Sequence, residues 1–249
     1  RYETPPPEPE GRRYLYRYQS MRNTLSLCIA LFCLAAGQAQ FKKDPILNLQ
    51  TEDKKFLNWG YYLGFNQFDF KFAYRNDQPI VDVQRTFGFN VGLIGEMRLH
   101  EFLDLRFEPG LFYSKRDLNF PGAPEGDQLR EVKSTYIRFP LLLKVNTRRF
   151  GNFKPFLIGG VSTALNLGAN EDAIDDNSSG TFRMKNQIFS YELGFGIDFY
   201  LEYFKFSPSI RGVFTLSDEL VQDADPASPW TGNIEAMRTR GIFINFTFE

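Results

Sequence analysis

Few side chains in this sequence could do chemistry. The chain has a single histidine, His100, and two cysteines, Cys28 and Cys33. Nucleophilic catalysis needs a nucleophile, a base and a group that orients the base. With a single histidine, the sequence offers no second candidate for this arrangement. A zinc site needs more nitrogen and sulfur ligands than these. We therefore expect no enzymatic activity, no metal site and no cofactor, and we expect His100 to be an exposed turn residue.

Two further patterns have both a chemical and a structural interpretation. A run of acids in a polar stretch could hold Ca²⁺, but its spacing does not match a twelve-residue calcium loop, so we favour a solvated loop. The run is Glu171, Asp172, Asp175 and Asp176. A Gly-x-Gly at 194–196 could cradle phosphate only before a helix, and no helical pattern follows it. We expect these glycines to ease sheet curvature or inward packing.

Composition narrows the class of protein. The 249 residues include 29 Lys and Arg against 30 Asp and Glu, which gives a net charge of −1. The protein as a whole therefore has no electrostatic attraction for nucleic acid. Hydrophobic content of 43% with a mean hydropathy of −0.34 excludes a helical polytopic membrane protein. These values are compatible with a membrane β-barrel, because apolar and polar residues alternate along its strands and the mean hydropathy is therefore low.

The N-terminal part has the pattern of a targeting segment. Residues 21–39 combine a basic start, an apolar run and a Gly-Gln-Ala site, which is typical of a secretory signal peptide. Both cysteines lie inside it, and the residues before them do not favour lipidation. We expect residues 1–20 to be upstream sequence outside the native protein. Residues 40–57 would form a periplasmic leader, which either is flexible or touches periplasmic partners.

Apolar and polar residues alternate with a period of two through residues 58–249. Such alternation predicts β-strands with one apolar and one polar face. In 85–99, for example, Phe87, Phe89 and Val91 share one face while Gly88 and Asn90 share the other. The predicted strands are 59–72, 85–99, 103–115, 135–146, 153–167, 187–199, 204–216 and 241–249.

The connections between these strands alternate in length. The short ones are 100–102, 147–152 and 201–203, and the long ones are 73–84, 116–134, 168–186 and 217–240. An even number of antiparallel strands with tight turns at one end and long loops at the other is typical of outer-membrane barrels. The fold prediction is therefore all-β, an eight-stranded antiparallel transmembrane β-barrel of the outer membrane, reached through the signal peptide.

Charged residues of both signs fall on the face that would line the barrel. Eight strands leave an interior that side chains just fill, and unpaired buried charges cost several kcal/mol each. We therefore expect a paired network and a plugged barrel. The candidates are Glu96, Arg98, Asp104, Arg106, Glu108, Arg138, Lys144, Glu192, Asp198, Lys205 and Arg211.

Two features conflict with regular strands. Four prolines, Pro109, Pro140, Pro155 and Pro208, lie inside predicted strands, where each lacks a ladder donor. We expect them at bulges or near the membrane ends. The aromatic pattern of 59–72 also changes phase, which predicts a bulge near Asn66 or a kink where the strand leaves the bilayer.

Two segments suggest contacts with other proteins. The last strand places Ile242, Ile244, Phe246 and Phe248 on one face, a pattern typical of substrates of the outer-membrane assembly machinery; the closing strand of a barrel needs the same apolar face. Trp230 lies between Pro229 and Thr231 in a polar loop. It is a possible partner-contact residue, and the alternative is that it folds back onto the barrel rim.

Several stretches resemble the PorT family, small outer-membrane barrels of the type IX secretion system in Bacteroidetes-type bacteria. They include WGYYLGFNQFDF (59–70), LRFEPGLFYSKRDL (105–118), REVKSTYIRFPLLLK (130–144), KPFLIGGVSTALNL (154–167) and residues 191–214. DDNSSGTFRMK (175–185) and residues 228–249 match as well. The loop-borne stretches are the more specific ones, since barrel formation does not require them.

The resemblance implies a role in the export of proteins across the outer membrane, as a member of the machinery and not as its conduit. The implied partners are outer-membrane lipid and other secretion-machinery proteins, together with the assembly machinery through the C-terminal strand. Two other classes stay open. One is a generic small barrel acting as a passive porin or ligand-binding protein, and the other is a lipid-modifying barrel enzyme.

Overall fold

The computed structural model describes residues 47–76 and 80–249. The predicted upstream segment 1–20, the signal peptide 21–39 and residues 40–46 of the leader lie outside the described residues. Within the described part, no helix is long and apolar enough to cross a membrane. The described residues hold two short 3-10 helices, η2 (Glu52–Lys54) and η3 (Asn177–Ser179), and otherwise consist of strands and loops.

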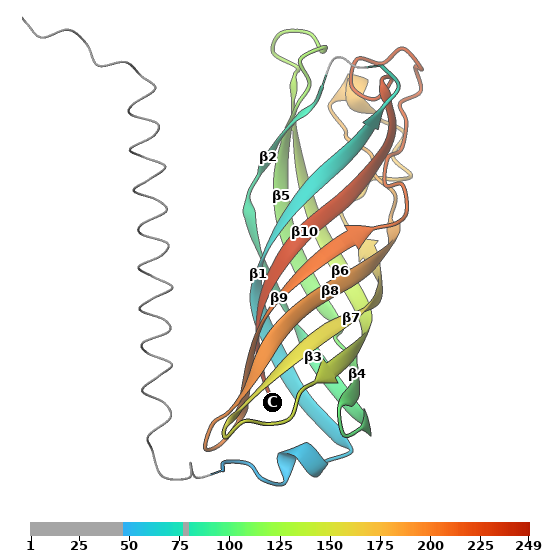
Figure 1. Cartoon of the computed structure of the whole chain (residues 1–249). Helices are drawn as coiled ribbons and strands as arrows, with labels where there is room; N and C mark the ends of the chain where they lie inside the picture. The colour runs from blue at the N-terminus through green and yellow to red at the C-terminus, as the bar shows by residue number, and fades with distance from the viewer. Residues whose placement is uncertain (1–46, 77–79) are drawn as a thin grey trace, which may run out of the picture. The chain divides into compact units, whose positions relative to one another are not determined.

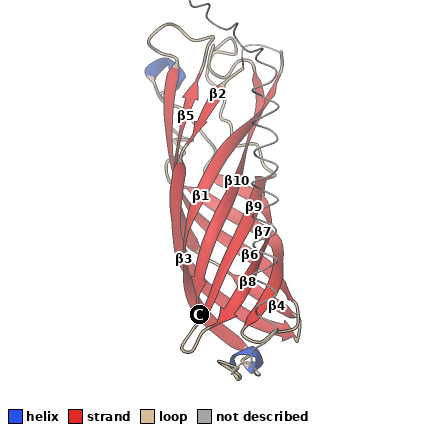
Figure 2. Ribbon diagram, turned by 60° about the vertical axis from the view of Figure 1, so that its left-hand side comes forward, coloured by secondary structure: helices blue, strands red, loops and turns tan. Residues whose placement is uncertain are grey.

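Ten strands form one sheet (Figures 1 and 2). They are β1 (Leu57–Tyr74), β2 (Asp82–Arg85), β3 (Phe87–His100), β4 (Leu103–Phe107), β5 (Gly110–Asn119), β6 (Leu129–Asn146), β7 (Phe153–Asn166), β8 (Gln187–Tyr200), β9 (Lys205–Thr215) and β10 (Ile234–Phe248). β2 and β3 are separated only by Thr86, and β4 and β5 only by Glu108 and Pro109. Because these interruptions are so short, the ten strands correspond to eight chain segments that each cross the barrel wall.

The sheet closes on itself. β1 pairs antiparallel with β10 on one side and with β3 on the other, and the remaining neighbours pair in chain order. Closure satisfies the backbone N–H and C=O groups without water, which a sheet in lipid requires. The prediction of an eight-stranded antiparallel barrel is confirmed, with two of its strands interrupted.

Short and long connections lie at opposite ends of the barrel. The short-turn end carries 101–102, 147–152 and 201–204, together with the C-terminus (Figure 1). The long-loop end carries residues 75–76 and 80–81 and the loops 120–128, 167–186 and 216–233. This segregation is the one that the sequence predicts, although β6 and β10 extend further into the long-loop end than the alternation indicates.

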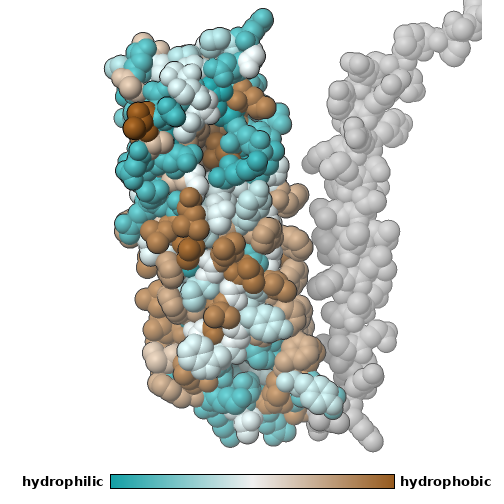
Figure 3. All heavy atoms as spheres, turned by 180° about the vertical axis from the view of Figure 1, so that it is seen from behind, coloured by the Kyte–Doolittle hydropathy of each residue, from teal (hydrophilic) through white to brown (hydrophobic). Residues whose placement is uncertain are grey.

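The outer wall is apolar over the part next to the short-turn end. Phe65, Phe87, Leu193 and Ile242 are among its exposed side chains. On the face that Figure 3 shows, apolar residues gather in the lower part and hydrophilic ones cover the long-loop end. Alternation thus sends apolar side chains outward because hydrocarbon surrounds them there.

The predicted bulge near Asn66 is wrong. β1 keeps an unbroken register with β10 from Tyr61 to Ala73, and its register shift lies at Ala73/Tyr74. The even-numbered residues of β1 face the interior throughout, and Phe68 and Phe70 are buried there. The aromatic pattern changes phase because the interior itself changes from polar to aromatic, while the strand continues without a break.

The prolines lie where the ladder can spare a donor. Pro109 falls in the interruption between β4 and β5, while Pro155 and Pro208 lie near the start of β7 and β9. Pro140 lies inside β6, which the prediction did not allow. Its carbonyl accepts from the Glu108 N–H at 3.2 Å, so its missing N–H faces the Glu108 carbonyl, which accepts from Tyr62 Oη at 3.5 Å instead.

Candidate functional site

Ion pairs fill the interior of the barrel toward the short-turn end. Arg106 of β4 is their centre: its Nε donates to Glu96 Oε2 at 2.6 Å, and its Nη1 lies 3.3 Å from Glu108 Oε1. Arg211 of β9 approaches Glu108 from across the barrel, with Nη2 at 2.5 Å from Oε2. All four residues are at most 3% exposed. Facing strands thus meet through paired charges.

The network continues along the strands on both sides of this centre. Glu192 of β8 accepts from Arg138 Nη2 at 3.0 Å and lies 3.2 Å from Arg211 Nη1. Lys144 of β6 donates to Asp198 Oδ2 at 2.7 Å. Lys144 and Lys205 each also reach Glu96, at 3.3 Å. Each cation of the network except Arg138 therefore contacts at least two carboxylates.

Glu249 belongs to the network although the sequence-based set omits it. Its Oε1 lies 2.9 Å from Arg106 Nη2, and its Oε2 contacts Lys205 Nζ. The signal was present in the sequence, because Asn245, Thr247 and Glu249 share the inward face of the last strand.

Charges of both signs balance within this group. Five cations, Arg106, Arg138, Lys144, Lys205 and Arg211, meet five carboxylates, Glu96, Glu108, Glu192, Asp198 and Glu249. Buried charges are tolerated when they are paired and hydrogen-bonded in this way. The structure thus brings together nine of the eleven residues that the sequence proposed.

The other two proposed residues lie at the edge of the network. Asp104 is buried and accepts from Asn146 Nδ2 at 2.5 Å, without an ion pair. Arg98 is only half-buried and turns toward the short-turn end, where its Nη1 donates to the Asp53 carbonyl. Both line a small polar pocket beneath residues 52–55.

A short segment closes the short-turn end. We call residues 47–56 the cap; the 3-10 helix η2 lies within it. Asn48 N donates to Asn152 Oδ1 at 3.0 Å, and its Nδ2 donates to the Tyr200 carbonyl at 3.1 Å. The part of the expected leader that the structure describes is therefore bound to the barrel, and the expectation of a flexible leader is wrong for it.

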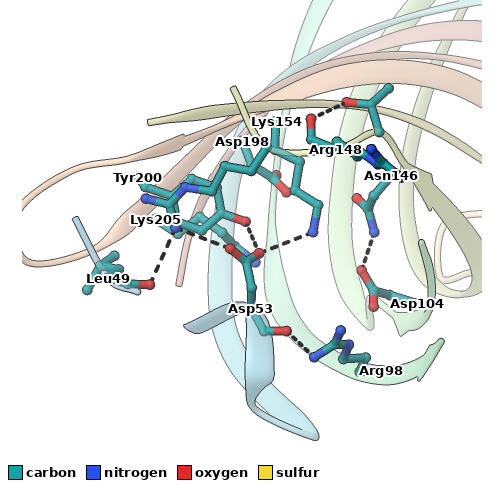
Figure 4. A network of polar contacts seen from close by, with 12 residues as sticks. Leu49, Asp53, Arg98, Asp104, Asn146, Arg148, Lys154, Asp198, Tyr200 and Lys205 are labelled. Atoms are coloured by element: carbon teal, nitrogen blue, oxygen red, sulfur yellow. Dashed lines mark hydrogen bonds and ion pairs between the residues drawn. The ribbon is translucent and has the colours of Figure 1, made fainter. Parts of the chain in front are cut away.

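Asp53 is the anchor of the cap (Figure 4). Its Oδ1 accepts from Tyr200 Oη at 2.6 Å and from Lys154 Nζ at 3.1 Å, and its Oδ2 lies 3.1 Å from Arg149 Nη1. Burial alone would raise the pKa of the Asp53 carboxyl, but the hydrogen bond from Tyr200, the charge of Lys154 and the hydrogen bonds from Lys154 and Arg149 outweigh it and lower that pKa below its ordinary value.

Aromatic and apolar side chains fill the interior beyond the charges. The middle of the barrel holds Tyr62, Phe68, Ile94, Phe112, Tyr136, Ala164, Ile188, Val213 and Phe243. Arg116 is fully buried above them: it lies 3.8 Å from the Phe70 ring centre and donates to Ser134 and Tyr136, each at 2.9 Å. Charged, aromatic and apolar layers thus succeed one another and leave the barrel filled.

The loops at the other end pack into a platform with its own core. We call loops 120–128, 167–186 and 216–233 together the loop platform. Asp223 is its polar centre, accepting from Asn177 Nδ2 at 3.0 Å, Ser228 Oγ at 2.6 Å and Thr231 Oγ1 at 2.8 Å. Apolar residues from these loops and the adjacent strands pack beneath, including Phe120, Phe182, Met184 and Leu220.

Trp230 is part of this platform. Its Nε1 donates to the Asp127 carbonyl at 3.1 Å, and its ring stacks on Arg130, with 5.0 Å between the guanidinium carbon and the ring centre. It also packs against the apolar core of the platform. These contacts support the alternative in which Trp230 folds back onto the barrel rim, and nothing in them favours a contact with a partner.

The aromatic C-terminal strand closes the barrel against β1. Phe248 faces Tyr61 and Ile244 faces Phe65 across the pair, and the rings of Tyr61 and Phe248 stack at 5.3 Å. Ile242 and Ile244 are exposed, while Phe246 and Phe248 are partly covered by neighbouring aromatics. Recognition of this strand by an assembly machinery stays a prediction.

The remaining chemical candidates have structural roles. His100 is exposed at the end of β3, and its carbonyl accepts from Arg98 Nε at 3.5 Å. Asp176 caps η3 by accepting from Ser178 N at 2.9 Å, and Glu171 accepts from Asn186 N at 2.6 Å. Within the described residues no group of three His, Cys, Asp or Glu could hold a metal ion.

The Gly194 and Gly196 pair faces inward, as the structural interpretation of this motif predicts. A Cβ on Gly194 would lie 2.6 Å from Arg211 Cγ, and one on Gly196 would lie 2.4 Å from Phe156 Cζ. The two glycines let these side chains of the interior pack directly against the wall.

A family model and several solved structures are similar to this chain. The family described as an outer membrane protein beta-barrel domain matches residues 38–221. No curated protein matches the sequence. Solved structures with a similar fold include OprG from Pseudomonas aeruginosa, 12% identical with a TM-score of 0.46, covering 76% of this chain and 94% of OprG. Another is Neisserial surface protein A, 12% identical with a TM-score of 0.39, covering 75% and 95%.

The family match covers most of the chain, and it includes strands from β1 through β9. Closed strand pairing and an apolar outer wall are the features that such a domain needs in a bilayer. The chain belongs to the outer membrane protein beta-barrel domain family and is located in the outer membrane.

Proposed function

We propose that this barrel is a non-enzymatic component of the type IX protein secretion machinery, needed for the export of proteins across the outer membrane. The observation that carries the proposal is the filled interior. Arg106, Arg138 and Arg211 cross it in buried ion pairs, and aromatic side chains fill the next layer. A barrel filled in this way acts through its surfaces, by contact with other proteins.

The loop platform supports the same proposal. The stretches 175–185 and 228–237 carry the resemblance to PorT-type barrels that barrel formation does not explain. The structure joins them: Asn177 of the first bonds to Asp223, which also accepts from Ser228 and Thr231 of the second. A defined surface built from two distant loops is a suitable place for recognition by a partner protein.

Deletion of the gene in its native host tests the proposal. We expect exported proteins to be lost from the culture medium and cell surface and to accumulate in the periplasm, with recovery on complementation by the wild-type gene. Complementation by a His100→Ala variant should restore export fully, because we assign no catalysis to that residue. Normal export by the deletion strain contradicts the proposed function.

A conductance measurement distinguishes the passive-porin alternative. The purified barrel in a planar bilayer should show no steady ion current, because the paired interior leaves no continuous water path. A matched barrel without the Arg138–Glu192 ion pair, Arg138→Ala with Glu192→Ala, serves as a positive control for opening the interior. A sustained current through the wild-type protein favours the porin function instead.

A further inference from the structure

The outer wall changes character abruptly on one side of the barrel, across β1, β2 and β10. Toward the short-turn end it exposes large apolar side chains, among them Phe65, Phe87 and Ile242, which are 57%, 78% and 56% exposed. Further toward the long-loop end the same side of the wall carries exposed basic residues, with Gln67 and Asp69 of β1 between them and Phe65. We call these the basic patch: Lys71, Arg85, Arg238 and Arg240.

Strand register brings the basic patch together. Lys71 of β1 faces Arg238 of β10, and Asp69 faces Arg240. Residues paired in this way have their Cβ atoms about 4.5–5.5 Å apart, and like charges directly opposite each other are destabilising. The Lys71 and Arg238 pair therefore places two like charges side by side, and Glu235 lies in the same small pocket as this pair.

Asp69 organises the two arginines nearest the apolar wall. Its Oδ2 accepts from Arg240 Nε at 3.0 Å and Nη2 at 2.7 Å, and lies 3.9 Å from Arg85 Nη1. The side chain of Asp69 is only 13% exposed, whereas those of Arg85 and Arg240 are 54% and 53% exposed. The carboxylate thus fixes one edge of the Arg240 guanidinium, and much of both arginine side chains remains exposed on the wall.

Other acids on these strands lie further away. Glu235 of β10 and Asp82 of β2 are each three residues beyond the nearest arginine of the patch, toward the long loops. Three residues span about 10 Å along a strand. Close to the apolar wall the patch therefore presents two guanidinium groups that share one largely covered carboxylate.

An apolar groove begins directly below these arginines. It is lined by Gly212, Phe214, Gly241 and Ile242, with Asp69, Arg85 and Arg240 at its upper side and Gln67 beside them. Gly212 faces outward, and the Phe214 ring lies against it: a Cβ at Gly212 would lie 3.1 Å from Phe214 Cε2. A basic rim above a groove of this kind matches a molecule with an anionic head and an apolar chain.

We propose that the basic patch and the groove beneath it bind a phosphorylated lipid of the membrane leaflet on the long-loop side. Phosphate oxygens would lie against the guanidinium groups of Arg85 and Arg240, which suit bidentate recognition. One acyl chain would follow the groove past Phe214 and Ile242. This site is independent of the proposed role in secretion, since it needs only the wall of the barrel.

Lipid titration of the purified barrel in detergent tests the site. The probes are lipid A with its phosphates, the same lipid A after enzymatic dephosphorylation, and inorganic phosphate, with bound lipid measured by native mass spectrometry. We expect the phosphorylated lipid to be retained at least about tenfold better than the dephosphorylated one, about 1.4 kcal/mol. Equal retention of the two lipids, or displacement of the lipid by millimolar inorganic phosphate, overturns the proposal.

A pair of double variants locates the site. Arg85→Gln with Arg240→Gln should abolish the preference for the phosphorylated lipid. The control, Lys115→Gln with Lys133→Gln, removes the same charge from β5 and β6, where Glu131 already lies 2.7 and 3.3 Å from the two lysines. The control should keep the preference. Equal losses in the two double variants would show a nonspecific charge effect and overturn the assigned site.

A milder substitution keeps the test valid if the double variant folds poorly. Arg240→Lys retains the charge but cannot offer a planar fork to a phosphate. We expect it to fold, as judged by the gel shift of unheated samples, and to lose several-fold in preference for the phosphorylated lipid. An Arg240→Lys barrel that is folded and retains the full preference contradicts the assigned contact.

Discussion

Tyr200 and Asp53 join the barrel wall to the segment that closes its short-turn end. The phenol oxygen of Tyr200, the last residue of β8, donates to Asp53 Oδ1 at 2.6 Å, although the two residues are 147 positions apart in the chain. Lys154 and Arg149 bind the same carboxylate. One acidic side chain of the cap thus connects it to β7, β8 and the turn between β6 and β7.

Asp53→Asn should loosen the cap while the barrel stays folded. Hydrogen bonds to charged groups contribute about 1.5–3 kcal/mol each, so loss of the charge should raise the opening rate of the cap at least about tenfold. Hydrogen–deuterium exchange of residues 48–54 measures this directly. Glu52→Gln is the matched control, because Glu52 pairs only with exposed Lys55 in the same segment. Equal exchange in wild type and Asp53→Asn would contradict the anchoring role.

Acid should release the cap only at low pH. The folded-state pKa of Asp53 lies below the unfolded value of about 3.9. Its stabilising effect is therefore fully present above that value and is lost as pH falls through the folded pKa. A fluorophore on Gln50→Cys reports the release by a fall in anisotropy; the chain has no cysteine after Cys33. The Asp53→Asn variant should lack this transition, and a wild-type midpoint above about pH 5 would contradict the assignment.

Glu96→Gln should destabilise the barrel strongly. Glu96 is 3% exposed and receives Arg106, Lys144 and Lys205, so its neutralisation leaves buried cations with too few carboxylates. Breaking one side of a buried ion pair costs about 3–5 kcal/mol. Urea-induced unfolding in lipid vesicles measures the change.

Glu131→Gln is the control for the buried charge. Glu131 also contacts two lysines, Lys115 and Lys133, but on the outer surface, where solvent screens the pairs. Its loss should change the unfolding midpoint very little. Similar shifts for Glu96→Gln and Glu131→Gln would mean that burial of the network does not govern its contribution.

The wall of the barrel could be predicted from the sequence because the solvent dictates it. Phe87, Phe89 and Val91 face outward since hydrocarbon meets every second residue, and this constraint acts within each strand separately. The same local rule placed Arg106 and Glu192 inside. It also explains one error: the change of phase at Phe68 and Phe70 predicts a bulge near Asn66, because local alternation cannot tell an aromatic interior from a lipid exterior.

The cap and the loop platform could not be predicted in this way. Asp53 lies 96 positions from Arg149 and 147 from Tyr200, and its segment has no periodicity that indicates where it binds. Trp230 is bound to Asp127, 103 positions away. Such contacts depend on which loops the closed barrel brings to the same end, and that follows only from the complete topology.

Asp223→Ala should loosen the loop platform without unfolding the barrel. The side chain of Asp223 accepts from Asn177, Ser228 and Thr231, and each would lose a buried acceptor. The indole of Trp230 should then become more exposed. In a Trp59→Phe background Trp230 is the only tryptophan, so a red shift of the emission and stronger acrylamide quenching report the change. Asp225→Ala is the control, because Asp225 is exposed and its side chain accepts from Ala227 N alone. If Asp223→Ala leaves the emission of Trp230 as it is in the control, the loops are held by their apolar core and Asp223 does not organise the platform.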